Sequence, residues 1–401
     1  MKRYLILLLC ALTACGTAAE APMSLKVVRS EMKRNPEASY IDGQEGNLKW
    51  NYTTGLELKA MLDVYEISRQ ARNDKYGVRK DHILEYVDAW YDAIIDEAGT
   101  IYKYKRSNYS TDHICPGRTL FQLYDITGKE KYRMAMDTLY RQIQEQPRTP
   151  EGGFWHKKIY PNQMWLDGLY MAQPFYAEYT RRYVDDSLKE ANYTDIAKQF
   201  QLVYDHTYDP ATGLLRHAWD SSHEMFWCDK TTGQSEHAWG RAMGWYAMAL
   251  VDVAEILPEG EPRSEIIDLL NKVMDSIMDY NEMSSFMWYQ VLDCPGKNGN
   301  YLESTCSAMF VYTLLKGTRL GILKNFTADD ARRFYTKMLQ CFVRLDKDNI
   351  INLTQCCEVA GLGGKQNRSG TFEYYINEPV RSNDPKGIGP LIWAALEIER
   401  Q

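Results

Sequence analysis

One aspartate lies in an apolar stretch of the sequence, where a charged side chain is either paired within the protein or part of a functional site. Asp167 lies between Leu166 and Gly168. The spacing predicts a helix with four bulky or apolar residues on one face: Trp165, Leu169, Ala172 and Tyr176. An acid in the first turn of a helix can be a simple terminal charge that the helix dipole favours. Because Gly168 leaves room beside the carboxylate, the alternative is an acid that faces a pocket.

A second carboxylate, Asp112, lies 55 residues before Asp167, and we expect both at the starts of successive helices of one kind. Two carboxylates close together repel, so one can stay protonated near neutral pH while the other is ionised, as general acid–base catalysis needs. If both are first-turn charges instead, the helix dipole lowers both pKa values and makes both acids poor proton donors. The residues alone do not decide between these alternatives.

One arginine is placed between two glycines and two tryptophans, in the string Trp239-Gly240-Arg241-Ala242-Met243-Gly244-Trp245. A guanidinium binds a planar carboxylate through two parallel hydrogen bonds, and the glycines would let a substrate approach. The tryptophans would stack on a sugar ring. The competing interpretation is a structural arginine that donates to loop carbonyl groups.

Aromatic and polar residues also gather in other predicted loops. His156 follows Gly-Gly-Phe-Trp and precedes Lys157, which adds positive charge, and His217 lies in an expected hairpin-like excursion at 215–220. Trp50 opens another aromatic loop. Stacking rings interleaved with hydrogen-bonding groups suit a carbohydrate. The sequence has no H-E-x-x-H, no G-x-S-x-G and no phosphate-binding glycine loop, so we expect neither a metal nor a cofactor.

The elements that must position these residues are predicted to be helices of two alternating kinds. Apolar helices, rich in small residues, are expected at about 53–68, 112–125, 164–180, 238–256, 303–317 and 387–400. Amphipathic, charged helices are expected at about 24–34, 79–96, 130–146, 190–206, 264–280 and 327–345. This alternation predicts an all-α (α/α)6 toroid, with an apolar inner ring inside an amphipathic outer ring. The alternative is an open α-solenoid used for binding. In a toroid the N-terminal ends of the inner helices, with their aromatic loops, converge on one face.

The N-terminus is predicted to be a targeting segment. Lys2 and Arg3 precede an apolar run at 4–14, which is too short for a membrane span. The following Leu-Thr-Ala-Cys-Gly resembles a bacterial lipobox, which implies a signal peptide at 1–14, lipidation of Cys15 and an anchor-proximal segment at 15–23. The chain would then be a lipid-anchored protein of the cell envelope of a Gram-negative bacterium, in contact with the membrane only through the anchor. The alternative is a secretory peptide cut near Ala18-Ala19.

Composition narrows the class of protein further. The chain has 401 residues with a net charge of −7, which argues against a nucleic-acid partner. No Pro/Gly/Ser linker interrupts residues 24–401, so we expect a single large domain there. The nine cysteines have neither zinc-site nor disulfide-framework spacing, and we interpret those after Cys15 as mostly buried thiols.

Three strings, in this order, resemble glycoside hydrolase family 105, the unsaturated rhamnogalacturonyl hydrolases. They are Gln-Met-Trp-Leu-Asp-Gly-Leu-Tyr-Met at 163–171, Trp-Gly-Arg-Ala-Met-Gly-Trp at 239–245, and Asn-Asp-Pro-Lys-Gly-Ile-Gly-Pro at 383–390. The resemblance covers the chain from about Trp50 to its C-terminus. Family 88, the unsaturated glucuronyl hydrolases, is related and shares the (α/α)6 fold.

The resemblance implies roles for individual residues. Asp167 corresponds to the general acid/base, and Asp112 to an acid that assists catalysis or binds the sugar. The residues implied or predicted to bind substrate are His156, Trp239, Arg241, Trp245, His217, Trp50 and Lys386. The match at His217 lies where loop lengths vary, and Lys386 fits the motif of the last helix.

The activity implied is removal of a 4,5-unsaturated uronic acid from the non-reducing end of oligosaccharides that polysaccharide lyases produce. Rhamnogalacturonan, a pectin component, is the polymer that the resemblance suggests. The implied mechanism is hydration of the C4=C5 bond. Two alternatives remain: a conventional (α/α)6 glycosidase or epimerase that acts on saturated sugars, and a non-catalytic glycan-binding lipoprotein.

Overall fold

The computed structural model of the chain describes residues 20–70 and 74–400, which are mostly helical. The inner ring consists of α2 (Tyr52–Gln70), α4 (Gly117–Thr127), α6 (Leu166–Tyr183), α8 (Gly240–Ile256), α10 (Ser304–Arg319) and α13 (Pro385–Glu399). The outer ring consists of α1 (Met23–Arg34), α3 (Ile83–Ile94), α5 (Glu130–Glu145), α7 (Asp186–Thr207), α9 (Glu261–Met278) and α11 (Ala328–Phe342). Each outer helix packs on one inner helix: α1 on α13, α3 on α2, α5 on α4, α7 on α6, α9 on α8 and α11 on α10.

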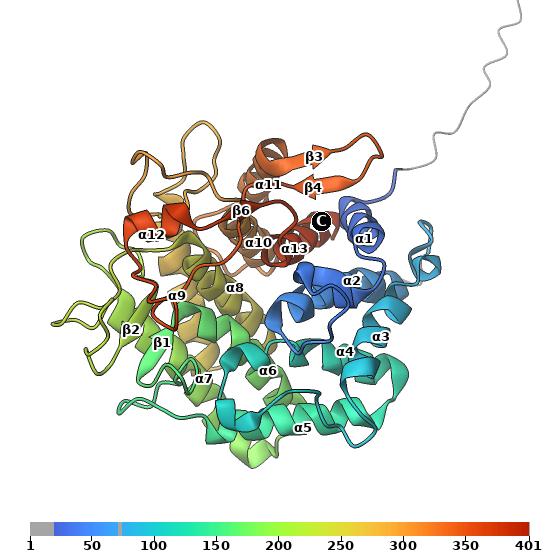
Figure 1. Ribbon diagram of the computed structural model, residues 1–401, viewed down its shortest axis with the longest axis horizontal. Helices are drawn as coiled ribbons and strands as arrows, with labels where there is room; N and C mark the ends of the chain where they lie inside the picture. Colours follow the sequence, from blue (N-terminus) through green and yellow to red (C-terminus); the bar gives the residue numbers. More distant parts are fainter. Residues whose placement is uncertain (1–19, 71–73, 401) are drawn as a thin grey trace, which may run out of the picture.

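The inner ring is closed. Each inner helix contacts the next one along the chain, and α13 returns to contact α2. Figure 1 shows the blue α2 beside the red α13 near the centre of the molecule, with α1, α3, α5 and α11 toward the periphery. The predicted all-α (α/α)6 toroid is therefore confirmed, and the open α-solenoid is wrong, because a solenoid would leave its first and last repeats apart.

Burial explains why the two kinds of helix differ in composition. Every residue of α8 from Gly240 to Ala254 is buried, since this helix has neighbours on all sides. The outer helix α11 buries a single stripe instead: Ala331, Phe334, Tyr335, Met338 and Phe342. An inner helix must be apolar nearly all round, whereas an outer helix needs one apolar face. This difference produces the alternating pattern in the sequence.

Two local predictions differ from the structure. The helix expected at 112–125 begins only at Gly117, because a proline at 116 disfavours helical geometry in the residue before it. Residues Thr111–His113 form a separate 3-10 turn, η4, so Asp112 precedes the inner helix and does not lie in its first turn.

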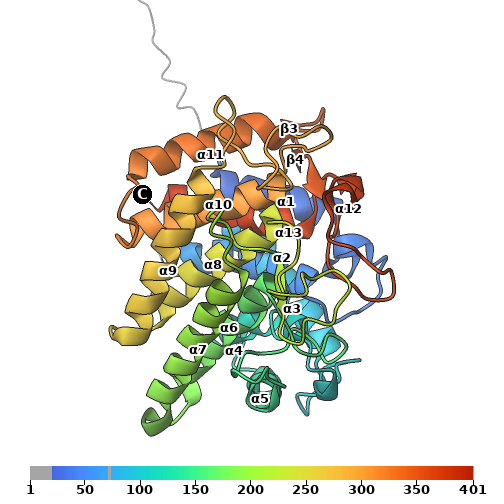
Figure 2. The same ribbon diagram turned by 90° about the vertical axis from the view of Figure 1, so that its left-hand side faces the viewer.

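Short antiparallel sheets organise the loops that carry the candidate site. Strand β1 (Gln163–Trp165) pairs with β2 (Ala218–Asp220), β3 (Val343–Leu345) with β4 (Ile351–Leu353), and β5 (Cys356–Cys357) with β6 (Val380–Arg381). The predicted hairpin-like excursion at 215–220 thus contains β2, whose partner is the strand that leads into α6. A short helix, α12 (Phe372–Asn377), follows β5. Figure 2 shows α12 and the long loops at one end of the helices.

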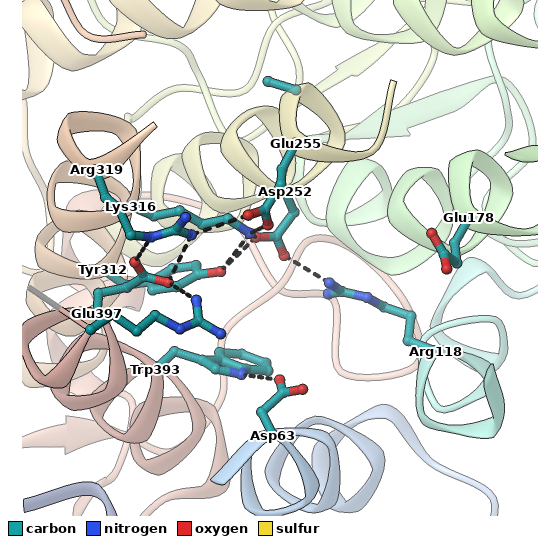
Figure 3. A network of polar contacts seen from close by, with 12 residues as sticks. Asp63, Arg118, Glu178, Asp252, Glu255, Tyr312, Lys316, Arg319, Trp393 and Glu397 are labelled. Carbon is teal, nitrogen blue, oxygen red and sulfur yellow. Dashed lines mark hydrogen bonds and ion pairs between the residues drawn. The ribbon is translucent and has the colours of Figure 1, made fainter. Parts of the chain in front are cut away.

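The opposite end of the inner ring is held by a buried network of charged groups (Figure 3). Asp252 of α8 accepts hydrogen bonds from Arg118 at 2.8 Å, from Lys316 at 2.7 Å and from Tyr312 at 2.6 Å. Asp63 of α2 accepts one from Trp393 of α13 at 2.7 Å. These groups surround a cavity of about 230 Å³. Side chains of α2, α4, α8, α10 and α13 therefore meet at this end through polar contacts.

Among the described residues all seven cysteines are free, five of them are buried and two are half-buried, which agrees with the interpretation of mostly buried thiols. Within residues 20–70 and 74–400, no helix is both long and apolar enough to cross a membrane. The predicted signal peptide and Cys15 lie outside the described residues.

Candidate active site

Asp167 lies where strand β1 is followed directly by helix α6, at the end of the ring that carries the long loops. In the β1–β2 pair Trp165 lies opposite Ala218, and the chain then enters α6 at Leu166, whose amide donates to the His217 carbonyl at 3.2 Å. Asp167 is in the first turn of α6. Its Oδ2 is buried without a hydrogen-bond partner in the described residues, yet 15% of the side chain is exposed. The exposed part of the carboxyl group is therefore on the Oδ1 side.

His217 is the nearest titratable neighbour of Asp167. The imidazole is fully buried, and its Nε2 lies 3.3 Å from Oδ2 of Asp167. The other ring nitrogen, Nδ1, is 2.7 Å from the hydroxyl oxygen of Tyr375 in α12. The structure thus places His217 beside the candidate acid, with both ring nitrogens directed at polar groups.

His156 lies in a stack of rings beside the start of α6. Its ring is parallel to Trp165 with centroids 4.6 Å apart, and Trp165 in turn stacks on Tyr160 at 5.0 Å. Burial lowers the pKa of His156 to about 4, so the imidazole is neutral at pH 7. A side chain at Gly168 would place its Cβ 3.1 Å from Nδ1 of His156. The glycine after Asp167 therefore makes room for this histidine.

Asp112 has a cationic environment. Its carboxylate forms an ion pair with Lys157, and its Oδ1 lies 3.5 Å from Nε2 of His156. Burial raises the pKa of Asp112, but the charge of Lys157, together with the adjacent His156, outweighs it and holds the pKa below the ordinary value. Asp112 is therefore ionised at neutral pH and cannot be the proton donor.

A cavity of about 390 Å³ opens beside this pair. Its lining includes Trp50, Tyr52, Asp112, Lys157 and Ile159. Trp50 is buried, since its indole is packed parallel to Trp90 and donates to the His113 carbonyl at 2.8 Å. Asp167 is not among the lining residues. Tyr52, which does line the cavity, feels the charge of Asp167. Burial raises the pKa of Tyr52 well above the ordinary value, and the charges of Asp112 and Asp167 raise it further.

Arg241 differs from the open anion clamp that the sequence suggests. Its guanidinium is 1% exposed and donates to the carbonyls of Cys357 and Glu358, with Glu303 at 3.8 Å. The guanidinium also lies 5.1 Å from the ring of Trp239. These contacts match the structural alternative, in which an arginine satisfies loop carbonyls.

The two tryptophans and two glycines around Arg241 are also internal. Trp239 stacks on Tyr375 at 5.9 Å, and Trp245 packs on Tyr170 at 4.8 Å; both indoles are 1% exposed. A Cβ at Gly244 would be 2.6 Å from Sδ of Met309 in α10, and one at Gly240 would be 2.9 Å from Sγ of Cys306. The glycines therefore allow α8 to approach α10, and the expectation that they admit a substrate is wrong.

Lys386 is likewise engaged within the protein. Its ammonium is buried and lies 2.9 and 3.1 Å from the two carboxylate oxygens of Asp384. Asp384 is the N-cap of α13 and accepts from the amide of Lys386 at 2.9 Å. The lysine thus stabilises the start of the last inner helix.

The structure therefore brings Asp112, His156, Asp167 and His217 together, and it buries Arg241, Trp239, Trp245 and Lys386 in the surrounding shell. Sequence reasoning missed Tyr375, which contacts His217 from 158 residues away. No local pattern marks it, since the helix that carries it has only six residues. It also missed Tyr52, although this residue lies in the aromatic loop that starts at Trp50.

One further group of donor atoms is close enough to hold a cation. Among the described residues, His237, Asp293 and Cys294 place one ligand atom each within 4.8 Å of one another. Oδ2 of Asp293 already receives hydrogen bonds from Arg216 at 2.7 Å and lies 2.9 Å from Nδ1 of His237. The guanidinium neutralises the carboxylate, so these contacts are those of a closed ion-pair cluster.

Comparison with known proteins gives the family. The profile of Glycosyl Hydrolase Family 88 matches residues 23–401. A family 105 glycoside hydrolase structure from C. acetobutylicum ATCC 824 is 41% identical, with a TM-score of 0.86 over 95% of this chain and 100% of that one. The unsaturated rhamnogalacturonyl hydrolase YesR of Bacillus subtilis is 25% identical over 277 residues, which are 68% of this chain and 72% of YesR.

A more distant structure has the same fold. The unsaturated glucuronyl hydrolase of Bacillus sp. GL1 is 12% identical, with a TM-score of 0.64 over 94% of this chain. The family profile spans nearly all of the described chain, and the family 105 structure is similar over its whole length. The chain therefore belongs to the glycosyl hydrolases of families 88 and 105.

Proposed function

We propose that this glycoside hydrolase removes a 4,5-unsaturated uronic acid from the non-reducing end of lyase-generated oligosaccharides. Asp167 is the general acid/base and acts by hydration of the C4=C5 bond. The observation that carries the proposal is the contrast between the two carboxylates. Asp112 is held ionised by Lys157 and His156. Asp167 keeps one oxygen open and the other beside His217.

The proposed reaction needs one acid that then serves as a base. Asp167 gives its proton to C4, a water oxygen bonds to C5, and one proton of that water returns to Asp167. The hemiketal then opens: the bond from C5 to the ring oxygen breaks, C5 becomes a ketone, and the ring oxygen takes the proton. The resulting hemiacetal at C1 expels the next sugar as an alcohol. General acid–base catalysis of this kind is typically worth about 10²–10⁴-fold in rate.

The other residues of the site suit the substrate. Lys157 is 25% exposed and lines the cavity, so it supplies positive charge where a uronic carboxylate would enter. Asp112, which is ionised, can accept hydrogen bonds from sugar hydroxyl groups or from the attacking water. His156 is neutral and positions the rings of Trp165 and Tyr160.

The test measures cleavage of the glycosidic bond and loss of the C4=C5 double bond in the same reaction. A lyase-generated unsaturated disaccharide is incubated with the enzyme, while the ultraviolet absorbance of its conjugated enol ether and the release of the second sugar are recorded. The proposal predicts that the absorbance falls in step with release. Release with persistent absorbance would show a conventional glycosidase, and binding without either change would show a glycan-binding protein.

The polymer from which the substrate derives is proposed from similarity alone. Because the chain is similar to YesR, we propose unsaturated rhamnogalacturonan disaccharides, products of pectin degradation, as the preferred substrate. A panel of lyase-generated disaccharides from different polymers tests the choice. Equal or faster turnover of a glycosaminoglycan-derived disaccharide would contradict it.

We further propose that the enzyme is anchored to the cell envelope of a Gram-negative bacterium through a lipid on Cys15. The sequence around Cys15 and the apolar run before it support this. Labelling with a radioactive fatty acid in the wild type, and its loss in Cys15→Ala, are the expected results. Unlabelled wild-type protein would contradict the anchor.

A further inference from the structure

We propose that Tyr375 is a positioning residue for the general acid. Its hydroxyl donates a hydrogen bond to Nδ1 of His217 and holds the proton of this imidazole on Nε2, which faces Oδ2 of Asp167. The catalytic proton of Asp167 is thereby left on Oδ1, the oxygen that is open to a substrate. This inference rests on the proposed function of Asp167 and deepens it.

The contacts define a chain of three side chains from three separate segments. Oη of Tyr375 lies 2.7 Å from Nδ1 of His217, and Nε2 of His217 lies 3.3 Å from Oδ2 of Asp167. Tyr375 and His217 are both fully buried. In the part of the chain that the structure describes, neither Nε2 of His217 nor Oδ2 of Asp167 has a hydrogen-bond partner, so each of these buried polar atoms has the other as its polar neighbour at 3.3 Å.

Hydrogen-bond satisfaction selects the tautomer. A neutral imidazole has one N–H donor and one acceptor nitrogen. With the proton on Nε2, the Tyr375 hydroxyl donates to Nδ1, and the Nε2 proton faces the Asp167 carboxyl group 3.3 Å away. With the proton on Nδ1, that proton would use the hydroxyl oxygen of Tyr375, and the hydroxyl proton would have no acceptor among the described residues. The second arrangement also turns the lone pair of Nε2 toward a carboxyl oxygen 3.3 Å away. An unpartnered hydroxyl proton and two facing acceptors are both costly, which favours the first arrangement.

The surroundings of Tyr375 keep its hydroxyl in place and protonated. The phenol ring stacks on Trp239, and its backbone carbonyl accepts from Gln290 at 3.2 Å. Burial raises the pKa of Tyr375 well above the ordinary value, and the neighbouring Tyr374 and Asp167 raise it further. The phenol is therefore protonated at neutral pH and can donate to His217.

Other charged groups face the site without competing for Nδ1 of His217. The groups that act on this cluster are His156 and Lys157 from the loop before β1, Asp112 from η4, Tyr52 from α2, Arg241 from α8, Asp384 from the start of α13, and Asp293 and Arg368 near Tyr375. Among the described residues, Nδ1 of His217 has a hydrogen bond only with Tyr375.

The variant that tests the proposal removes one atom. Tyr375→Phe keeps the ring that stacks on Trp239 and deletes only Oη. We expect kcat to fall about 10-fold while KM stays within about twofold, because one hydrogen bond that acts on the acid, not on the substrate, is lost. The matched control is Tyr374→Phe, whose hydroxyl accepts from the Gly361 amide at 3.0 Å, and which should leave both constants unchanged.

A double-mutant cycle separates positioning from a general structural effect. His217→Gln replaces the imidazole by an amide whose NH₂ group can donate to Asp167 without help from Tyr375. Adding Tyr375→Phe to His217→Gln should then cause no further loss of kcat, so the two changes are strongly non-additive. Additive losses in the double variant would overturn the proposal.

A direct readout needs no substrate. In full-length enzyme labelled with nitrogen-15 at histidine, we expect the His217 ring to show a protonated Nε2 and an unprotonated Nδ1, with this pattern lost or averaged in Tyr375→Phe. A protonated Nδ1 in the wild type would overturn the proposal. Because the spectrum is independent of turnover, this failure is distinct from a failure of the proposed function, which would appear as no activity on unsaturated disaccharides with the Nε2–H tautomer intact.

Discussion

Asp112 and Asp167 have the same side chain in different electrostatic surroundings. Burial alone would raise the pKa of Asp112, but Lys157 and His156 outweigh it, so this carboxylate is ionised. Asp167 has no such cation against it: Nε2 of His217 lies 3.3 Å from its Oδ2, and its other oxygen is open. The sequence left open which effect would win at these acids. For Asp112 the neighbouring Lys157 decides it, and Asp167 is the acid that we propose as the proton donor.

The first prediction concerns Asp167 itself. Asp167→Asn keeps the size of the side chain and removes its transferable proton. We expect kcat to fall by about 10²–10⁴-fold with KM largely kept. The measurement is steady-state turnover of an unsaturated disaccharide. Turnover near the wild-type rate would remove Asp167 from the mechanism.

The second prediction separates two roles for Arg241. The guanidinium is buried and donates to the carbonyls of Cys357 and Glu358, so Arg241→Ala should weaken the loop that carries them. We expect equal losses of kcat/KM on the free acid and on its methyl ester, with a lower midpoint of thermal unfolding. A markedly larger loss on the free acid would show instead that Arg241 binds the substrate carboxylate.

At this scale the sequence predicted the two acids and two histidines that the structure brings together, but it did not predict that Arg241 is buried. Its motif is symmetrical and rich in aromatic residues, as an anion site would be. The carbonyls that satisfy it come from 116 and 117 residues later in the chain, and no local pattern reports such partners. Tyr375 was missed for the same reason. Contacts at long sequence separation decide both.

At the scale of elements, the two kinds of helix could be predicted because the burial of each helix determines where its apolar residues recur. An inner helix such as α8 has neighbours on every side, whereas α11 buries one stripe, and both signals are periodic along the chain. The glycines of α8 were misread, since a glycine leaves space without indicating what fills it. At Gly244 the space is filled by Met309 of α10.

The third prediction tests how the inner helices are joined at their far end. Asp252 is buried between Arg118 and Lys316, which lower its pKa although burial raises it. Asp252→Asn leaves two buried cations without their common partner, so we expect a loss of roughly 3–5 kcal/mol in the free energy of unfolding. Denaturant titration at pH 7 measures it.

The control for Asp252 is an exposed ion pair of the outer surface. Asp268 lies 3.1 Å from Lys324, and both side chains are exposed. Asp268→Asn should change the free energy of unfolding by about 0–1 kcal/mol. Equal effects of the two substitutions would contradict a stabilising role for the buried network.

On the scale of the whole molecule, the two ends of the ring differ. At one end Asp167 lies in the first turn of α6, and His217 and Asp112 lie beside it in the loops before β2 and α4. At the other end the helices are joined by buried ion pairs. The site therefore lies on a closed scaffold whose far end is tied together, which keeps the residues at the loop end in fixed relative positions.

The fourth prediction concerns the pH dependence of stability. Burial lowers the pKa of His156 to about 4, from 6.5 for an exposed histidine. As the pH falls through 6.5 the unfolded chain takes up a proton that the folded protein does not, so stability is lost between pH 6.5 and pH 4. Between pH 7 and pH 5 this amounts to about 2 kcal/mol. His156→Gln should remove that part of the slope.

The quantity to compare between variants is the change in unfolding free energy from pH 7 to pH 5, because other groups titrate in the same range. Burial raises the pKa of Glu31 to about 7, which acts in the opposite direction in both proteins. Denaturant midpoints at pH 7 and pH 5 are compared for the wild type, for His156→Gln and for His82→Gln, whose side chain is 77% exposed. An unchanged slope in His156→Gln would contradict the assignment of a buried neutral imidazole.

The most direct test of the central claim is a proton NMR time course of one unsaturated disaccharide with the wild-type enzyme in deuterium oxide. If Asp167 delivers the proton to C4, the vinyl proton signal disappears as the leaving sugar is released, and the product carries one deuterium at C4 in a single configuration. Release of the leaving sugar while the vinyl signal persists would contradict hydration and with it the role given to Asp167.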